Sequence, residues 1–194
     1  AASVLNEKYE VGIFEKGSYG NGMTNNETFG YHNFYDTNGI QQTRGYKVLL
    51  LAGMGIGGGT SVNWTTSLRT PNQILNEWDT LTKQDNYFNS SEFRKSMDVV
   101  CKELNVDIKN NRIPQKEEKL ALGLELNNLS YKIIPRNTSN DECTESGFST
   151  FGRYDESINS TNKIWFSEER FEPNNVFSDT NITSLDLSNG RATH

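Results

Sequence analysis

Short apolar runs separated by long polar stretches set the pattern of this chain. Val48 to Ala52 form an uncharged apolar run that passes directly into a cluster of glycines, which is typical of a strand followed by a tight turn. Tyr9 to Phe14 alternate in polarity and predict another short strand, preceded at Ala1 to Asn6 by the last turns of a helix. The interval from Ser18 to Arg44 is polar and has no fixed period, so it predicts a loop.

Three later segments carry apolar side chains at helical spacing and predict helices. They are residues 72–82, 90–104 and 114–126. In the first of them the spacing predicts Trp78 in the core, with Glu77 and Asp79 facing outward. In the second it places Cys101 on the apolar stripe, which favours a packing thiol.

Two strand signals follow these helices. Tyr131 to Arg136 is a short apolar stretch that includes Pro135, and it predicts a strand that ends at the proline. The tail from Asn175 has alternating apolar positions interrupted by Asn189-Gly190, which is a strong hairpin signal. We therefore expect the tail to begin a hairpin.

The glycines between Gly53 and Gly59 carry the candidate chemistry. Such a turn lets backbone N–H groups approach one anion closely, and Thr60 or Ser61 would cap a helix that begins after it. We expect several of these N–H groups to converge on an open space that suits a phosphate. The Walker phosphate loop does not fit because its lysine is missing, and the Rossmann loop spaces its glycines differently. A flexible loop without a ligand, or a nucleotide-phosphate nest, stays open at this point.

Composition narrows the possible functions. The 194 residues have a formal net charge of -6 and a pI near 5.0, which allows one domain with a sizeable core and argues against nucleic-acid binding. No apolar run is long enough to span a membrane, and no secretory signal is visible in the first residues. Cys101 and Cys143 are too few for a disulfide framework or a metal site, so we predict two free thiols and no metal.

The segment LLAGMGIGGGTSVNWTTSLRTPNQILNEW resembles the glucose-methanol-choline (GMC) oxidoreductase family, and within it the long-chain (fatty) alcohol oxidase branch. Met54 and Ser67 depart from the family signature. In the family this segment lies along the pyrophosphate and the flavin ring of FAD. The resemblance therefore implies a set of FAD-contacting residues: Gly57, Gly58, Gly59, Thr60, Ser61, Asn63, Trp64 and Thr65.

The stretch Val11 to Gly17 resembles the family's second strand, which ends in a glutamate. There Glu15 would accept hydrogen bonds from the ribose hydroxyls of FAD, although a lone Glu after a strand is otherwise a solvated residue. The tail resembles the strand pair that passes beside the adenine, and this assigns Ile182 to the cofactor site. Residues 141–154 resemble a segment that is cysteine-rich in relatives, of which Cys143 remains.

The resemblance implies an α/β fold, namely a partial FAD-binding (Rossmann-like) domain with a mostly helical insertion. We expect residues 1–82 to form its first part, residues 83–170 an insertion on the cap or substrate side, and residues 171–194 its return strands. The family's first strand and glycine fingerprint have no counterpart before residue 1, so the chain resembles an internal fragment.

The implied reaction is FAD-dependent oxidation of a long-chain primary alcohol to an aldehyde, with oxygen as acceptor. The family's catalytic base is a histidine in the C-terminal half; His32 and His194 lie in other segments, so no catalytic residue is assigned. The alternatives are a non-catalytic, truncated or degenerate flavoprotein and a dehydrogenase acting on another alcohol. We expect no nucleic-acid partner, membrane association only through parts outside this chain, and an intracellular location, peroxisomal or endomembrane by resemblance.

Overall fold

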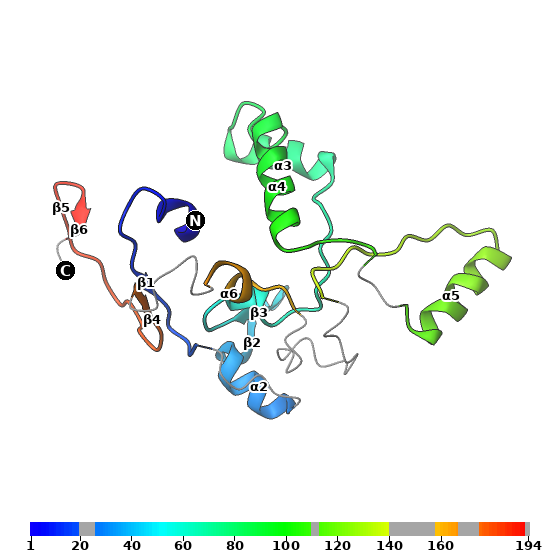
Figure 1. Ribbon diagram of the computed structural model, residues 1–194, viewed down its shortest axis with the longest axis horizontal. Helices are drawn as coiled ribbons and strands as arrows, with labels where there is room; N and C mark the ends of the chain where they lie inside the picture. Colours follow the sequence, from blue (N-terminus) through cyan, green and yellow to red (C-terminus); the bar gives the residue numbers. More distant parts are fainter. Residues whose placement is uncertain (20–25, 110–112, 140–157, 167–174, 193–194) are drawn as a thin grey trace. The chain divides into compact units, whose positions relative to one another are not determined.

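The computed structural model describes five stretches of the chain, and its helices and strands are labelled in Figure 1. These stretches are residues 1–19, 26–109, 113–139, 158–166 and 175–192. They form two compact units. The first contains residues 1–64 and the described residues from Ser160 onward, and the second contains residues 65–139 together with residues 158–159. The predicted division at residues 82 and 170 stays a prediction, and residues 141–157 and His194 lie outside the described part.

The second unit contains the three predicted helices. They are α3 (Asn72–Thr82), α4 (Ser91–Glu103) and α5 (Gln115–Leu126), so all three predictions are confirmed. Ser90 caps α4 because its hydroxyl accepts a hydrogen bond from the N–H of Phe93. Pro114 precedes the first turn of α5, where its missing N–H costs no helical hydrogen bond.

Helices α3 and α4 lie side by side (Figure 1). The ring of Phe88, in the connection between them, contacts Trp78 of α3 and Phe93 of α4. Trp78 contacts Phe88 edge to face but keeps 39% of its surface exposed, so its predicted core position is wrong. Asp79 was predicted to face outward and is instead buried. The chain turns back after α3, and the returning N–H of Phe88 donates to Asp79 Oδ1 at 2.9 Å. This hydrogen bond satisfies the carboxylate and offsets the cost of its burial.

The prediction of a loop from Ser18 to Arg44 is wrong over most of the part that the structure describes. It contains α2 (Glu27–Phe34) and β2 (Tyr35–Gln42), and β2 pairs antiparallel with β3 (Leu49–Gly53). Asn26 caps α2 by accepting from the N–H of Phe29. The polar strand lacks an alternating pattern because its register shifts between Tyr35 and Ile40. Pairing with the predicted strand β3, rather than its own composition, holds β2 in place.

The remaining strands are short. β1 (Ile13–Phe14) pairs parallel with β4 (Val176–Phe177), as expected for strands distant in sequence, while β5 (Leu187–Ser188) and β6 (Arg191–Ala192) form the predicted hairpin. Asn189 and Gly190 both have positive φ in its turn, which confirms the Asn-Gly signal. The predicted strand from Tyr131 to Arg136 is absent from the described structure, where Arg136 makes isolated bridges to Thr66 and Asp107.

The described elements are mixed α/β, and the Rossmann-like arrangement stays a prediction. The first unit also holds the predicted N-terminal helix α1 (Ala2–Leu5), the 3-10 turn η1 (Gly58–Thr60) and the short helix α6 (Thr161–Trp165). None of the helices in the described residues has the length and apolar character needed to cross a membrane.

A small apolar core holds the first unit together. Phe34, Tyr35 and Val62 are buried and pack together, with Tyr31 against them. The Tyr35 hydroxyl donates to the carbonyl of Val62 at 3.5 Å. Burial, with a smaller contribution from Tyr31, raises the pKa of Tyr35 to about 12. The core therefore links the end of α2 to the segment that follows the glycines.

This pKa predicts a loss of stability at high pH. The unfolded chain releases the Tyr35 proton near pH 10.0 and the folded chain near pH 12, so the contribution to folding is complete below pH 10 and is lost between these values. Urea unfolding of the chain at pH 9 and at pH 11.5 measures the drop. We expect Tyr35→Phe to reduce it and Tyr9→Phe, at an exposed tyrosine, to leave it unchanged. An equal drop in wild type and Tyr35→Phe would contradict this assignment.

Candidate functional site

Glu15 lies directly after β1 and contacts the glycine segment. Its backbone N–H donates to the carbonyl of Phe177 at 2.9 Å, which continues the pairing between β1 and β4. Its side-chain Oε1 accepts hydrogen bonds from the N–H of Gly17 at 2.8 Å and from the N–H of Gly55 at 3.0 Å. The structure therefore places Glu15 against the glycine segment at Gly55, and its role as a ribose ligand stays a prediction.

The glycine segment forms one tight turn, and no α-helix begins directly after it. The N–H of Ile56 donates to the carbonyl of Ser18 at 3.1 Å, and the N–H of Gly58 donates to the carbonyl of Gly55 at 2.8 Å. The N–H groups of Thr60 and Ser61 are bonded within η1. The prediction that several N–H groups converge on open space is therefore wrong for most of the turn. The turn is too short for an α-helix, so its donors bond to its own carbonyls.

Two N–H groups of the turn differ from the others. Those of Gly57 and Gly59 have no hydrogen-bond partner within the part of the chain that the structure describes. These two donors of the predicted phosphate loop are therefore the candidates for contact with a ligand.

The glycines of the turn serve different purposes. A Cβ at Gly53 would lie 2.5 Å from the backbone nitrogen of Gly59, and a Cβ at Gly57 would lie 2.4 Å from the hydroxyl oxygen of Ser61. Gly55 and Gly57 also have φ of 104° and 92°, which side chains rarely adopt. Gly59 is exposed, and a Cβ there would meet nothing within 4 Å. The fold requires the first three glycines, whereas nothing in the described structure requires Gly59.

The hydroxyls of Thr60 and Ser61 hold the turn closed. Thr60 Oγ1 donates to the carbonyl of Gly57 at 2.5 Å and accepts from the N–H of Thr161 at 3.0 Å, and Ser61 Oγ donates to the carbonyl of Ile56 at 3.3 Å. The predicted role of these residues as caps of a following helix is wrong, because they end a 3-10 turn. We did not predict a role for Thr161 from the sequence, because it lies 101 positions from Thr60 and no local pattern indicates their contact.

The other predicted cofactor residues lie in different surroundings. Asn63 Nδ2 donates to the carbonyls of Gly59 at 2.8 Å and Thr60 at 2.9 Å, so this side chain fixes the end of the turn. Trp64 follows it and is 69% exposed. Ile182 is exposed and lies between β4 and β5, outside the strands. Its role beside the adenine stays a prediction.

Thr65 belongs to the second unit and is completely buried. Its φ of 62° is rare for a β-branched residue and costs about 1–3 kcal/mol. Arg136 Nε donates to Thr65 Oγ1 at 2.8 Å, and the N–H of Asn137 donates to the Thr65 carbonyl at 3.2 Å. Within the described chain, the side chain of Thr65 thus serves a polar network, and its contact with a cofactor stays a prediction.

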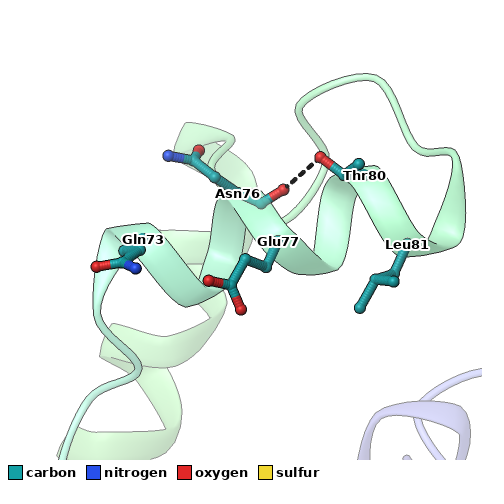
Figure 2. Close-up of a pocket in the computed structure, with 5 residues that line it drawn as sticks. All are labelled: Gln73, Asn76, Glu77, Thr80 and Leu81. Carbon is teal, nitrogen blue, oxygen red and sulfur yellow. Dashed lines mark hydrogen bonds between the residues drawn. The ribbon is translucent and has the colours of Figure 1, made fainter.

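A shallow hollow on α3 is lined by residues of that helix alone, and there the Thr80 hydroxyl donates to the carbonyl of Asn76 (Figure 2). It includes none of the predicted site residues. No group of His, Cys, Asp and Glu in the described residues could hold a metal ion, and His32 is exposed on α2. The turn between Gly53 and Ser61, together with Glu15, is therefore the candidate site.

Comparison with known proteins decides the family. A family profile described as GMC oxidoreductase matches residues 31–193. The chain belongs to the GMC oxidoreductase family. The matched region is the N-terminal, FAD-binding domain of that family, and it includes the glycine turn of this GMC chain.

Curated relatives place the chain in the long-chain-alcohol oxidase branch. It is 32% identical to long-chain-alcohol oxidase FAO4A of Arabidopsis thaliana over 168 residues, which is 85% of this chain and 23% of that protein. It is 30% identical to FAO4B of the same plant over 167 residues, covering 85% of this chain and 22% of that protein. The chain thus spans less than a quarter of these relatives. No solved structure gives a significant match.

The different purposes of the glycines predict different effects of alanine. Gly53→Ala should destabilise the chain by about 1–3 kcal/mol, because the new methyl group would overlap the backbone of Gly59. Gly59→Ala should change stability by less than about 0.5 kcal/mol, since the methyl group enters open space in a helical turn. Urea unfolding of the two variants measures the difference. Equal losses would show that the turn is not packed as described.

Proposed function

We propose that this chain forms part of the FAD site of a longer enzyme that oxidises long-chain primary alcohols to aldehydes with oxygen as acceptor. The single observation that carries the proposal is the glycine turn, in which Gly59 is open to solvent and the N–H of Gly55 donates to the carboxylate of Glu15. Membership of the GMC family and the similarity to long-chain-alcohol oxidases support the choice of cofactor and reaction. The relatives are more than four times as long as the matched region, which supports a longer protein.

The residues of the turn fit a dinucleotide. The N–H groups of Gly57 and Gly59, which have no partner among the described residues, would donate to pyrophosphate oxygens. The bonds described above use Oε1 of Glu15, so Oε2 is available to accept from ribose hydroxyls. The hydroxyls of Thr60 and Ser61 bind the chain itself and would support the turn rather than contact phosphate. A mononucleotide-phosphate nest that uses these hydroxyls is therefore disfavoured.

The chain's own residues bind and orient, and the reactive chemistry belongs to the cofactor. Bound FAD supplies an acceptor for the hydride of the alcohol carbon and returns the electrons to oxygen. The overall balance is one alcohol and one O₂ giving one aldehyde and one H₂O₂. The alcohol proton must go to a general base. The resemblance assigns this base to a histidine in another part of the longer enzyme, so we propose that this chain alone does not turn over.

The proposal is tested by Gly59→Ala in the longer protein, with Gly123→Ala as matched control. Gly123 is also a glycine whose Cβ would meet nothing within 4 Å, but it lies on α5, away from the turn in the sequence. Gly59→Ala should raise the Kd for FAD at least tenfold, because the methyl group enters the space where the phosphate would lie. Gly123→Ala should keep the wild-type Kd.

Two measurements report the result. Flavin absorbance after gel filtration gives the bound fraction, and release of H₂O₂ with hexadecanol gives the oxidase activity. Wild-type protein without bound flavin would overturn the proposal in favour of a non-catalytic flavoprotein relative. Bound flavin that is reduced by the alcohol but releases no H₂O₂ would indicate a dehydrogenase.

A further inference from the structure

We propose that Arg136 is a positioning residue that holds Thr65 in its left-handed backbone conformation and thereby fixes the end of the cofactor-binding segment. This proposal rests on the proposed function for its effect on FAD. The contact itself, between the guanidinium of Arg136 and the hydroxyl of Thr65, lies entirely within the second unit.

Thr65 differs from the other residues with positive φ. Within the described chain, most of these are Asn, Asp or Lys at turns and helix ends, where the left-handed region is common. Thr37 and Thr65 are the β-branched ones, and Thr37 is exposed in the irregular part of β2. Thr65 is completely buried. A strained, buried residue of this kind persists only where its surroundings hold it in place.

The hydrogen bonds described here for Thr65 come from one distant segment, residues 136–137, and from one near neighbour, Ser67. Arg136 Nε donates to Thr65 Oγ1 at 2.8 Å, and the N–H of the next residue, Asn137, donates to the Thr65 carbonyl at 3.2 Å. Ser67 Oγ donates to the same carbonyl at 3.1 Å. Both the side chain and the main chain of Thr65 are thus held, and Arg136 and Asn137 supply two of these three hydrogen bonds.

Arg136 is itself well anchored. Its N–H donates to the carbonyl of Asp107 and its carbonyl accepts from the N–H of Asp107, both at 3.2 Å. These bonds use the main chain, so a substitution of the side chain leaves them in place. The guanidinium can therefore be removed while the bridge between the two segments remains.

The consequence for the candidate site follows from chain geometry. The φ angle of Thr65 sets the orientation of the peptide that joins it to Trp64. A change of Thr65 to ordinary negative φ would turn the Trp64 carbonyl and the Thr65 N–H, both in the segment that the family resemblance assigns to the flavin. Arg136 lies outside that segment, and its proposed effect on the site runs through Thr65.

The test is a double-mutant cycle in the longer protein with Arg136→Met, Thr65→Gly and the pair. Glycine adopts positive φ without strain, so the Thr65→Gly background no longer needs the guanidinium. Arg136→Met alone should raise the Kd for FAD at least tenfold and change the visible circular dichroism of the bound flavin. In the Thr65→Gly background the same substitution should change the Kd less than threefold. Lys132→Met, at an exposed cation nearby in the sequence, should have no effect.

The cycle separates this proposal from the proposed function. Equal losses of FAD affinity from Arg136→Met in both backgrounds would make Arg136 an ordinary structural residue and overturn the proposal, while the flavin function stands. If wild-type protein binds no FAD, the proposed function fails and the role at the cofactor fails with it. In that case the same double-mutant cycle is measured on the unfolding equilibrium constant. A coupling of at least tenfold between Arg136 and Thr65 supports the claim that Arg136 holds Thr65, and a coupling below threefold contradicts it.

Discussion

The hydrogen bonds from Gly17 and Gly55 to Oε1 of Glu15 are the interactions on which the candidate site depends. They connect two parts of the first unit that are 40 positions apart, the parallel pair β1 and β4 and the glycine turn after β3. An anionic acceptor strengthens hydrogen bonds to backbone N–H groups. The carboxylate therefore fixes the turn where it would also contact a dinucleotide, and its loss would release both features together.

Some residues of the glycine turn stabilise the fold, and another faces solvent. Gly53, Gly55 and Gly57 allow close backbone approaches or positive φ, and Thr60 closes the turn through Thr161. At Gly59, no close backbone approach in the described structure requires a glycine. A glycine without a packing role leaves room for another group to approach its backbone closely. We propose that the pyrophosphate of FAD is that group.

Local patterns predicted the elements that local forces determine. Apolar spacing predicted the bounds of α3, and the turn preference of Asn189-Gly190 predicted the hairpin of β5 and β6. The contacts that shape the site are distant in sequence. Nothing near Thr60 indicates Thr161, and nothing near Asp79 shows that Phe88 will return to bury it. The polar strand β2 escaped prediction because its partner β3, rather than its own sequence, holds it in place.

We propose that the turn offers the N–H groups of Gly57 and Gly59 to a cofactor, while Glu15 already accepts from a third donor, the N–H of Gly55. Amide hydrogen exchange of the longer protein, resolved for single residues and measured with and without FAD, tests this directly. We expect FAD to slow exchange at Gly57 and Gly59 and to leave Gly55 unchanged, because the N–H of Gly55 is already bonded to Glu15. Unchanged exchange at Gly57 and Gly59 in the presence of bound FAD would contradict it.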